Sequence, residues 1–313
     1  MPVRSHAGAV ITSGAVSMGI NDTGELNFGF NPETGLPFGI ALAGVGDGIS
    51  PGCLCEGWGV AVNGTISGGA SQSNAAPGNL TLSPFTSTAS TATSVVTLTT
   101  LRTLSVTQAY APSASSALFQ NTVTITNTGA AVTDLLYTRV MDWDIPPTPF
   151  SELVTIKGVG ATNLVFFNDN GFSNVDPLTS ADPEIVAGTT NVNFTDSGPA
   201  DHGAYFKFNF GSLAADSSKT FNIFYGATGS EAAALAALGT VGAEVYSLGQ
   251  SDGSVLGSDF TTGTPGTFIF GFAGVGGTPL PPPDGTVPEP STLLLSLLGL
   301  GMSALRLRKW KTS

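Results

Sequence analysis

The chain has 313 residues, which is enough for one large domain or two ordinary ones. Glycine is frequent (41 residues) and charged residues are sparse (10%), a composition that favours β-strands joined by tight turns over helices and over disorder. The net charge is −12, and the first 290 residues carry all 22 acidic residues but only six of the ten basic ones. This excess of negative charge excludes nucleic acid as a partner of the body.

Residues 1–7 are predicted to be the remnant of a signal peptide or an unstructured start. Ser5-His6-Ala7 before Gly8 resembles the small-residue end of a signal peptide. The stretch MPVRSHAGAV contains no apolar segment, so we hypothesise that the true start lies upstream of Met1. The folded body is expected to begin at Gly8.

Residues 8–275 are predicted to form an all-β body, either one large antiparallel β-sandwich or two packed sandwiches. Apolar and polar residues alternate with period two in many runs, among them 122–126 (TVTIT), 205–210 (YFKFNF) and 221–225 (FNIFY). The segment 94–110 is long enough for two strands or one bent strand. The segment 111–117 (APSASSA) fits a linker or a surface loop, and we expect one continuous body.

One short helix is expected at 229–239 (GSEAAALAALG). Ser230 fits the N-cap, Glu231 the first turn, and Gly239 the position just after the helix. A tight turn is expected at 127–129, with Gly129 at positive φ. The segment around this turn (NTVTITNTGAAVTDLLYTRV) resembles a strand-turn-strand of bacterial surface Ig-like modules.

Cys53 and Cys55, the only cysteines, stand two residues apart in PGCLCEGWG. In an extended strand their Cα atoms would lie about 6.5 Å apart, near the upper limit for a disulfide, so a bridge requires a turn. Gly52 and Gly57 permit one. Three interpretations stay open: a local disulfide, free or intermolecular thiols, and a metal or redox site, although zinc would need two further ligands.

Two tryptophans stand beside acidic residues, in CEGWG and MDWDIPP. Trp58 and Trp143 would serve as sugar-stacking platforms if exposed, and otherwise pack in the core. Asp142 and Asp144 face the same way in a strand and could join 168–170 (NDN) in a Ca²⁺ site. No loop matches an EF-hand, and Asx clusters commonly form turns. We therefore expect no metal and no cofactor, with Ca²⁺ as the alternative.

The chain offers little for catalysis. Carboxyl pairs such as Asp142/Asp144 and Asp182/Glu184 would suit glycoside hydrolysis, but any acidic β-protein contains such pairs. His202 is the one histidine base in the body, and its surroundings (GPADHGAY) indicate a turn. The glycine-rich GVGDG and GVGG precede no helix, so they indicate turns and not phosphate-binding loops. The chain is therefore not expected to be an enzyme.

The C-terminal end has a different character. Residues 276–290 (GGTPLPPPDGTVPEP) are predicted to form an extended Pro/Gly-rich linker. Residues 291–313 begin with 15 uncharged residues and end with a basic flank, which consists of Arg306, Arg308, Lys309 and Lys311. Such a helix is about 25 Å long, and snorkelling basic side chains extend it to a bilayer core of about 30 Å. We expect a transmembrane helix with its basic end in the cytoplasm, the alternative being a buried core helix.

The segment VPEPSTLLLSLLGLGMSALRLRKWK (287–311) resembles a PEP-CTERM sorting domain, which consists of a Pro-Glu-Pro signal, an apolar helix and a basic end. The resemblance covers about 25 residues. It implies export, anchoring in the inner membrane, and recognition by an exosortase, a membrane-embedded cysteine transpeptidase. Pro288, Glu289 and Pro290 would then be the recognition triplet.

The sequence therefore predicts an exported protein of the cell surface or the exopolysaccharide matrix, with a structural or adhesive role. Exosortase, the membrane and exopolysaccharide are its expected partners. The alternatives are a carbohydrate- or Ca²⁺-binding surface module and, less favoured by the residues, a glycan-active hydrolase.

Overall fold

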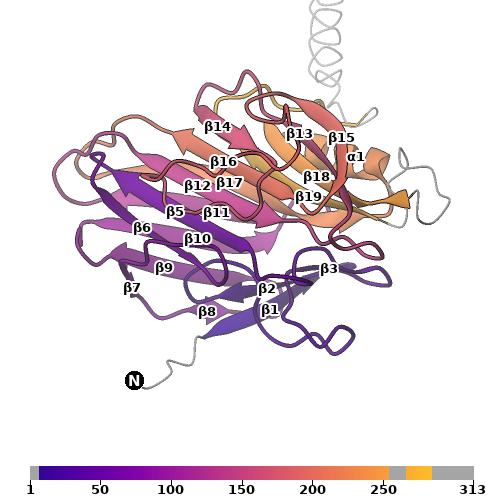
Figure 1. Ribbon diagram of the computed structural model, residues 1–313. Helices are drawn as coiled ribbons and strands as arrows, with labels where there is room; N and C mark the ends of the chain where they lie inside the picture. The colour runs from indigo at the N-terminus through magenta and orange to yellow at the C-terminus, as the bar shows by residue number, and fades with distance from the viewer. Residues whose placement is uncertain (1–6, 254–265, 284–313) are drawn as a thin grey trace, which may run out of the picture. The chain divides into compact units, whose positions relative to one another are not determined.

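The computed structural model describes residues 7–253 and 266–283 (Figure 1). Contacts divide the chain into two units, Met1–Pro281 and Pro282–Ser313, and every described strand and helix belongs to the first. This unit is an antiparallel β-sandwich with one described helix, which confirms the predicted fold class. The predicted membrane helix at 291–313 lies outside the described residues. Within the described ranges, no helix is long and apolar enough to cross a membrane.

The larger layer of the sandwich is a ten-stranded sheet in which every neighbouring pair is antiparallel. Its order is β15-β13-β18-β19-β17-β11-β10-β9-β7, and β8 also pairs with β9. The strands are β7 (Leu80–Leu82), β8 (Thr86–Ser87), β9 (Ala92–Leu98), β10 (Leu104–Pro112), β11 (Leu118–Asn127), β13 (Glu152–Lys157), β15 (Phe194–Ala200), β17 (Ser217–Thr228), β18 (Val245–Ser251) and β19 (Thr267–Ala273).

The smaller layer is a five-stranded antiparallel sheet in the order β14-β16-β12-β5-β6. Its strands are β5 (Glu56–Val62), β6 (Ile66–Ser71), β12 (Leu136–Asp142), β14 (Leu164–Asn168) and β16 (Gly203–Asn209). Strand β12 lies at the centre of this sheet, so both of its edges are hydrogen-bonded. Its side chains are buried from Tyr137 to Asp142, which places the end of β12 inside the molecule.

Aromatic side chains fill the space between the two sheets, as the period-two pattern predicts. Phe206 and Phe208 of β16 lie 5.5 and 4.9 Å, between ring centroids, from Phe270 and Phe272 of β19 respectively. These residues and 38 others belong to one buried cluster that includes residues of both sheets. The body is therefore one sandwich, and the alternative of two packed sandwiches is wrong.

A third sheet of four short strands packs on this core (Figure 1). It consists of β1 (Gly8–Ser13), β2 (Val16–Asn21), β3 (Ile40–Leu42) and β4 (Gly46–Asp47), paired in that order. Ile11, Met18 and Ile40 are fully buried in the common core, and β3 lies against β17. The sequence analysis did not separate this sheet from the sandwich.

The single described helix, α1 (Glu231–Thr240), covers part of the outer face of the ten-stranded sheet, where Leu238 packs in a small cluster with Phe224 and Ile269. Ser230 is the N-cap, as predicted, and its Oγ accepts a hydrogen bond of 3.3 Å from the backbone N–H of Ala233. The predicted end is wrong: Gly239 is buried inside the helix. The glycine with positive φ is Gly242 (φ 62°), after the C-cap.

The structure decides between alternatives that the sequence left open for 94–117, and it corrects the predicted conformation of Gly129. Residues 94–110 form two strands, β9 and β10, and the segment after β10 is the turn of a hairpin with β11 and not a linker. At the end of β11 the turn depends on Asn127, whose Oδ1 accepts a hydrogen bond from the N–H of Gly129 (3.0 Å). Gly129 does not take a positive φ. A Cβ at this position would lie 2.6 Å from Oγ1 of Thr103, so close packing explains this glycine.

The chain stays attached to the body beyond residue 275. The N–H of Gly277 donates to Oε2 of Glu244 (2.9 Å), and the N–H of Leu280 donates to the carbonyl of Ala243 (2.8 Å). The first residues of the predicted linker are therefore part of the folded unit.

Candidate functional site

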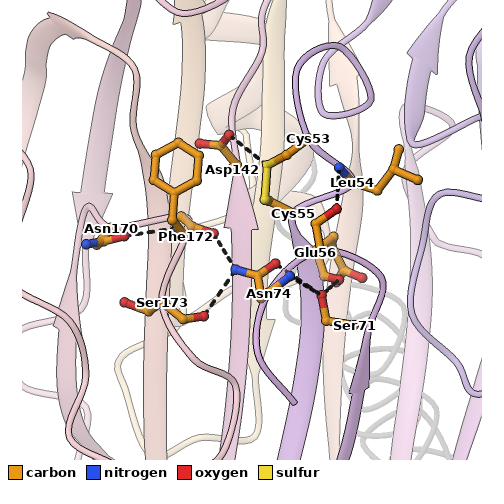
Figure 2. The surroundings of a disulfide bond; sticks show 12 residues. Cys53, Leu54, Cys55, Glu56, Ser71, Asn74, Asp142, Asn170, Phe172 and Ser173 are labelled. Carbon is orange, nitrogen blue, oxygen red and sulfur yellow. Dashed lines mark hydrogen bonds between the residues drawn. A yellow bond between two sulfur atoms is a disulfide. The ribbon is translucent and has the colours of Figure 1, made fainter.

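A disulfide joins Cys53 and Cys55 just before β5 (Figure 2). Their Cα atoms are 5.1 Å apart, closer than in an extended strand, and Gly52 before them takes a φ of 78°. Sγ of Cys53 lies 3.6 Å from Oδ2 of Asp142. A disulfide sulfur has no hydrogen to donate, so this is a packing contact. The structure therefore has the local disulfide among the three interpretations.

Four carboxyl groups gather where β12 ends. Asp142 is the last residue of β12, Asp144 follows two residues later, Glu152 begins β13, and Asp201 lies between β15 and β16. One oxygen from each of Asp142, Asp144 and Asp201 lies within 4.8 Å of the other two. Glu152 is near enough to raise the pKa of Asp142, and Asp144 raises that of Glu152. These four residues are called the acidic cluster below.

The buried members of the acidic cluster lack protein partners. Asp142, Asp144 and Glu152 are at most 1% exposed, whereas Asp201 is exposed. Both carboxylate oxygens of Asp144, Oδ1 of Asp142 and Oε2 of Glu152 have no hydrogen-bond partner among the described residues. Burial and mutual repulsion raise the pKa of Asp144 to about 8 and that of Glu152 to about 9. The group is therefore stable only with added protons or with an added cation.

The two tryptophans are core residues. Trp58 and Trp143 are both fully buried. The indole N–H of Trp58 donates to the carbonyl of Thr23 (3.0 Å), and that of Trp143 donates to Oγ of Ser247 (3.0 Å). Neither ring can stack on a sugar, so of the two alternatives for these residues the structure has core packing.

The asparagine-rich turn at 168–170 does not join Asp142 and Asp144. Oδ1 of Asn168 accepts from the N–H of Asn170 (3.2 Å). The carboxylate of Asp169 accepts from the N–H groups of Ile185 (2.8 Å) and Val186 (2.9 Å) and from Thr189 Oγ1 (2.8 Å). These oxygens are occupied in holding loops together. The alternative in which this turn joins Asp142 and Asp144 is therefore not what the structure shows, and Asp201 lies beside them instead.

The remaining catalytic candidates also have structural partners. His202 is fully buried, and its Nδ1 lies 2.8 Å from Oδ2 of Asp169, while its Nε2 lies 3.2 Å from the carbonyl oxygen of Glu152. Both ring nitrogens are thus engaged. Glu184 accepts from three backbone N–H groups of residues 188–190, at 2.6–3.0 Å. Asp182, its expected pair, accepts at Oδ2 from the N–H of Asn174 (3.3 Å).

The sequence analysis missed a buried ion pair on β12. The guanidinium of Arg139 is fully buried and pairs with Glu56 of β5. Its other N–H groups donate to Oε1 of Gln108 (2.7 Å), the hydroxyl of Tyr110 (3.2 Å) and the carbonyl of Gly24 (3.3 Å). Burial opposes the charge, but Glu56 outweighs it and holds the pKa of Arg139 well above its ordinary value. The signal in the sequence was a lone arginine inside an alternating strand.

The outer face of the ten-stranded sheet carries rows of hydroxyl groups, which were not predicted from the sequence. Registers place Thr97, Ser105, Thr126 and Ser218 in one row across β9, β10, β11 and β17. In this row Thr126 and Ser218 are hydrogen-bonded at 2.9 Å, and in the next row Thr124 and Thr220 are bonded at 3.1 Å. These side chains are partly or fully exposed and uncharged. They are called the hydroxyl face below.

Comparison with protein families identifies the C-terminal end. Residues 286–309 match the PEP-CTERM protein-sorting motif. The chain carries a PEP-CTERM sorting signal. The match includes Pro288, Glu289 and Pro290 together with the basic residues up to Lys309, whereas Lys311 lies beyond it. All of these residues lie outside the described part of the structure.

The PEP-CTERM motif indicates where the protein is sent in the cell. It directs secretion, transient membrane anchoring and processing by an exosortase. The motif thus marks the chain as a substrate of another enzyme. A search among curated proteins finds no significant match to the chain.

Proposed function

We propose that this protein is a non-enzymatic structural or adhesive component of the cell surface or exopolysaccharide matrix. The PEP-CTERM motif at 286–309 carries the proposal, because it sends the body out of the cytoplasm. The partners of the body are then extracellular polymers and other surface molecules.

The hydroxyl face supports exopolysaccharide as that partner. Neighbouring strands of a sheet lie about 4.8 Å apart, so the rows present regularly spaced donors and acceptors on a broad surface. Thr124 and Thr126 lie at its centre, and they carry no charge that would have to be desolvated on contact with a neutral polymer. A polysaccharide offers the complementary set of hydroxyl groups.

Two of the catalytic candidates, His202 and Glu184, support a non-enzymatic role. His202, Glu184 and Asp169 hold the backbone and side chains of loops, as described above. Such fully engaged groups are not free to exchange protons with a substrate.

The test compares retention in the matrix. The double substitution Thr124→Glu and Thr126→Glu places two charges on the hydroxyl face, and Thr65→Glu, at an exposed turn, is the matched control. After washing of intact cells, we expect the double variant to be released into the medium and the control to stay. Equal retention of both variants, with unchanged thermal unfolding, would contradict exopolysaccharide binding by this face.

A further inference from the structure

We propose that the acidic cluster is a Ca²⁺ site whose ligands are Asp142, Asp144 and Asp201, with the carboxyl group of Glu152 close by. The site lies at the end of β12. It is next to the disulfide, because Sγ of Cys53 contacts Oδ2 of Asp142. The proposal concerns the folded body and is independent of the sorting route.

The site contains buried carboxylate oxygens that have no hydrogen-bond partner among the described residues. Asp47 is a buried aspartate near the cluster, and its carboxylate accepts from the N–H groups of Gly39 (2.7 Å), Ile49 (3.1 Å) and Ser50 (3.0 Å). Among the buried aspartates of the described residues, only Asp142 and Asp144 have oxygens without a hydrogen-bond partner. An unpaired buried carboxylate is strongly unfavourable, so a ligand is needed to balance it.

The carboxylate oxygens lie close enough together to bind one ion. Oxygen ligands bind Ca²⁺ at about 2.3–2.6 Å, so oxygens that share one ion lie at most about 5 Å apart. The oxygens of Asp142, Asp144 and Asp201 meet this limit, at 4.8 Å or less. The backbone holds two of them in place, since the N–H of Asp142 donates to the carbonyl of Cys55 and that of Asp144 to the carbonyl of Gly48. Asp201 is exposed and gives the ion a way in.

The side chains at this site are of the kind that bind hard cations. All three ligand side chains offer hard carboxylate oxygens, which Ca²⁺ and Mg²⁺ prefer. The nearby sulfurs of Cys53 and Cys55 are bonded to each other, and both nitrogens of His202 are engaged, so soft-metal ligands are lacking here. Mg²⁺ keeps several waters and demands octahedral geometry, whereas Ca²⁺ accepts many carboxylate oxygens in flexible geometry. The crowded buried carboxylates therefore favour Ca²⁺.

The experiment uses the full chain, freed of metal with EDTA and then supplied with CaCl2 or MgCl2. Calorimetric titration should show one Ca²⁺ per chain with a Kd below about 1 mM. At a hundredfold excess over Kd, the Tm of wild type should rise by roughly 5–10 °C. MgCl2 at the same concentration should raise it by less than half as much.

Variants distinguish a cation site from a structural acidic cluster. Asp144→Asn should abolish the Ca²⁺-dependent rise in Tm. In EDTA above pH 8, where the Asp144 carboxyl group of wild type is charged, the variant should unfold at a higher temperature because this buried charge is removed. Asp201→Asn, at the exposed side, should weaken Ca²⁺ binding at least tenfold and serves if Asp144→Asn does not fold. The matched control is Asp216→Asn, an exposed residue at a φ of 50° that Asn tolerates. It should respond as wild type does.

Three results would overturn the proposal. Wild type could show no Ca²⁺ binding and no change in Tm. Asp144→Asn and Asp201→Asn could both bind Ca²⁺ as wild type does. Equal stabilisation by Mg²⁺ and Ca²⁺ would overturn the assignment of the ion.

Discussion

Two buried sites with ionisable side chains lie along β12 and just beyond its end, and their charges are compensated differently. In the middle of the strand, Arg139 is compensated within the protein by Glu56, Gln108 and Tyr110. At its end, Asp142 and Asp144 are equally buried but have neighbours of the same charge and oxygens without partners. Arg139, Asp142 and Asp144 are buried alike, so the difference comes from their partners and not from burial.

The comparison shows how a buried charge indicates function. A compensated charge such as Arg139 stabilises the fold by itself, and its removal exposes the partner that remains. A cluster of buried carboxylates without partners destabilises the isolated chain. Ionisable groups perturbed in this way occur at binding and catalytic sites, where a ligand supplies the missing partner. The first site is therefore assigned to architecture, and the second to binding.

The largest expected effect comes from breaking the compensated site. Arg139→Met leaves the buried carboxylate of Glu56 without its cation and should lower the free energy of unfolding by about 3–5 kcal/mol. Urea unfolding measures it, with the exposed Arg102→Met as the control, expected within about 0.5 kcal/mol of wild type. The double variant Glu56→Gln/Arg139→Met should recover much of the loss. A loss below about 1 kcal/mol for Arg139→Met would show that the pair is not essential to the core.

A second prediction concerns Glu25, which is 5% exposed and has an unpaired Oε2. Burial, the largest cause, raises its pKa from 4.5 to about 7. A raised pKa in the folded state means that stability is full below pH 4.5 and falls as the pH rises through 7. The loss approaches about 3 kcal/mol above pH 8.

Glu25→Gln removes this titration, so it should be more stable than wild type at pH 8.5 and close to it at pH 4.5. Chemical unfolding at the two pH values measures the difference, with Glu33→Gln, an exposed residue, as the control. If the difference in the free energy of unfolding between wild type and Glu25→Gln is the same at both pH values, burial does not hold the Glu25 carboxyl group neutral.

A smaller effect is expected from the disulfide beside the acidic cluster. The bridge between Cys53 and Cys55 closes a loop of three residues, so replacing both with Ser should lower the free energy of unfolding by only about 1.5 kcal/mol. Urea unfolding under non-reducing conditions measures it, and the m-value should not change. A decrease in the free energy of unfolding above about 3 kcal/mol would mean that the disulfide stabilises contacts beyond the three-residue loop that it closes.

The strands were predictable because their signal is local. Val123 and Ile125 alternate with threonines, and the structure buries the first set and partly exposes the second. The helix was predictable for the same reason, but its end was not. Gly239 resembled a C-terminal glycine, yet packing against the sheet carries the helix past it to Thr240, and Gly242 takes the left-handed conformation.

Half of the candidate site was predictable. Asp142 and Asp144 stand two residues apart in the sequence and were identified there, with Ca²⁺ as the alternative to no metal. Asp201 and Glu152 were not, because strand pairing brings them in from distant segments. Arg139 was missed because an isolated arginine in a strand usually faces solvent. These partners depend on tertiary structure, which period and composition do not contain.

The measurement that tests the central claim most directly is the intact mass and location of the protein expressed from its native locus. Wild type is compared with Glu289→Ala in the PEP-CTERM triplet and with Asp284→Ala, an acidic residue just before the motif, as the control. We predict that wild type and Asp284→Ala lie outside the inner membrane with a mass that ends near Pro290, while Glu289→Ala keeps its tail in the membrane. A wild-type protein in the cytosol whose mass extends to Ser313 would contradict the account.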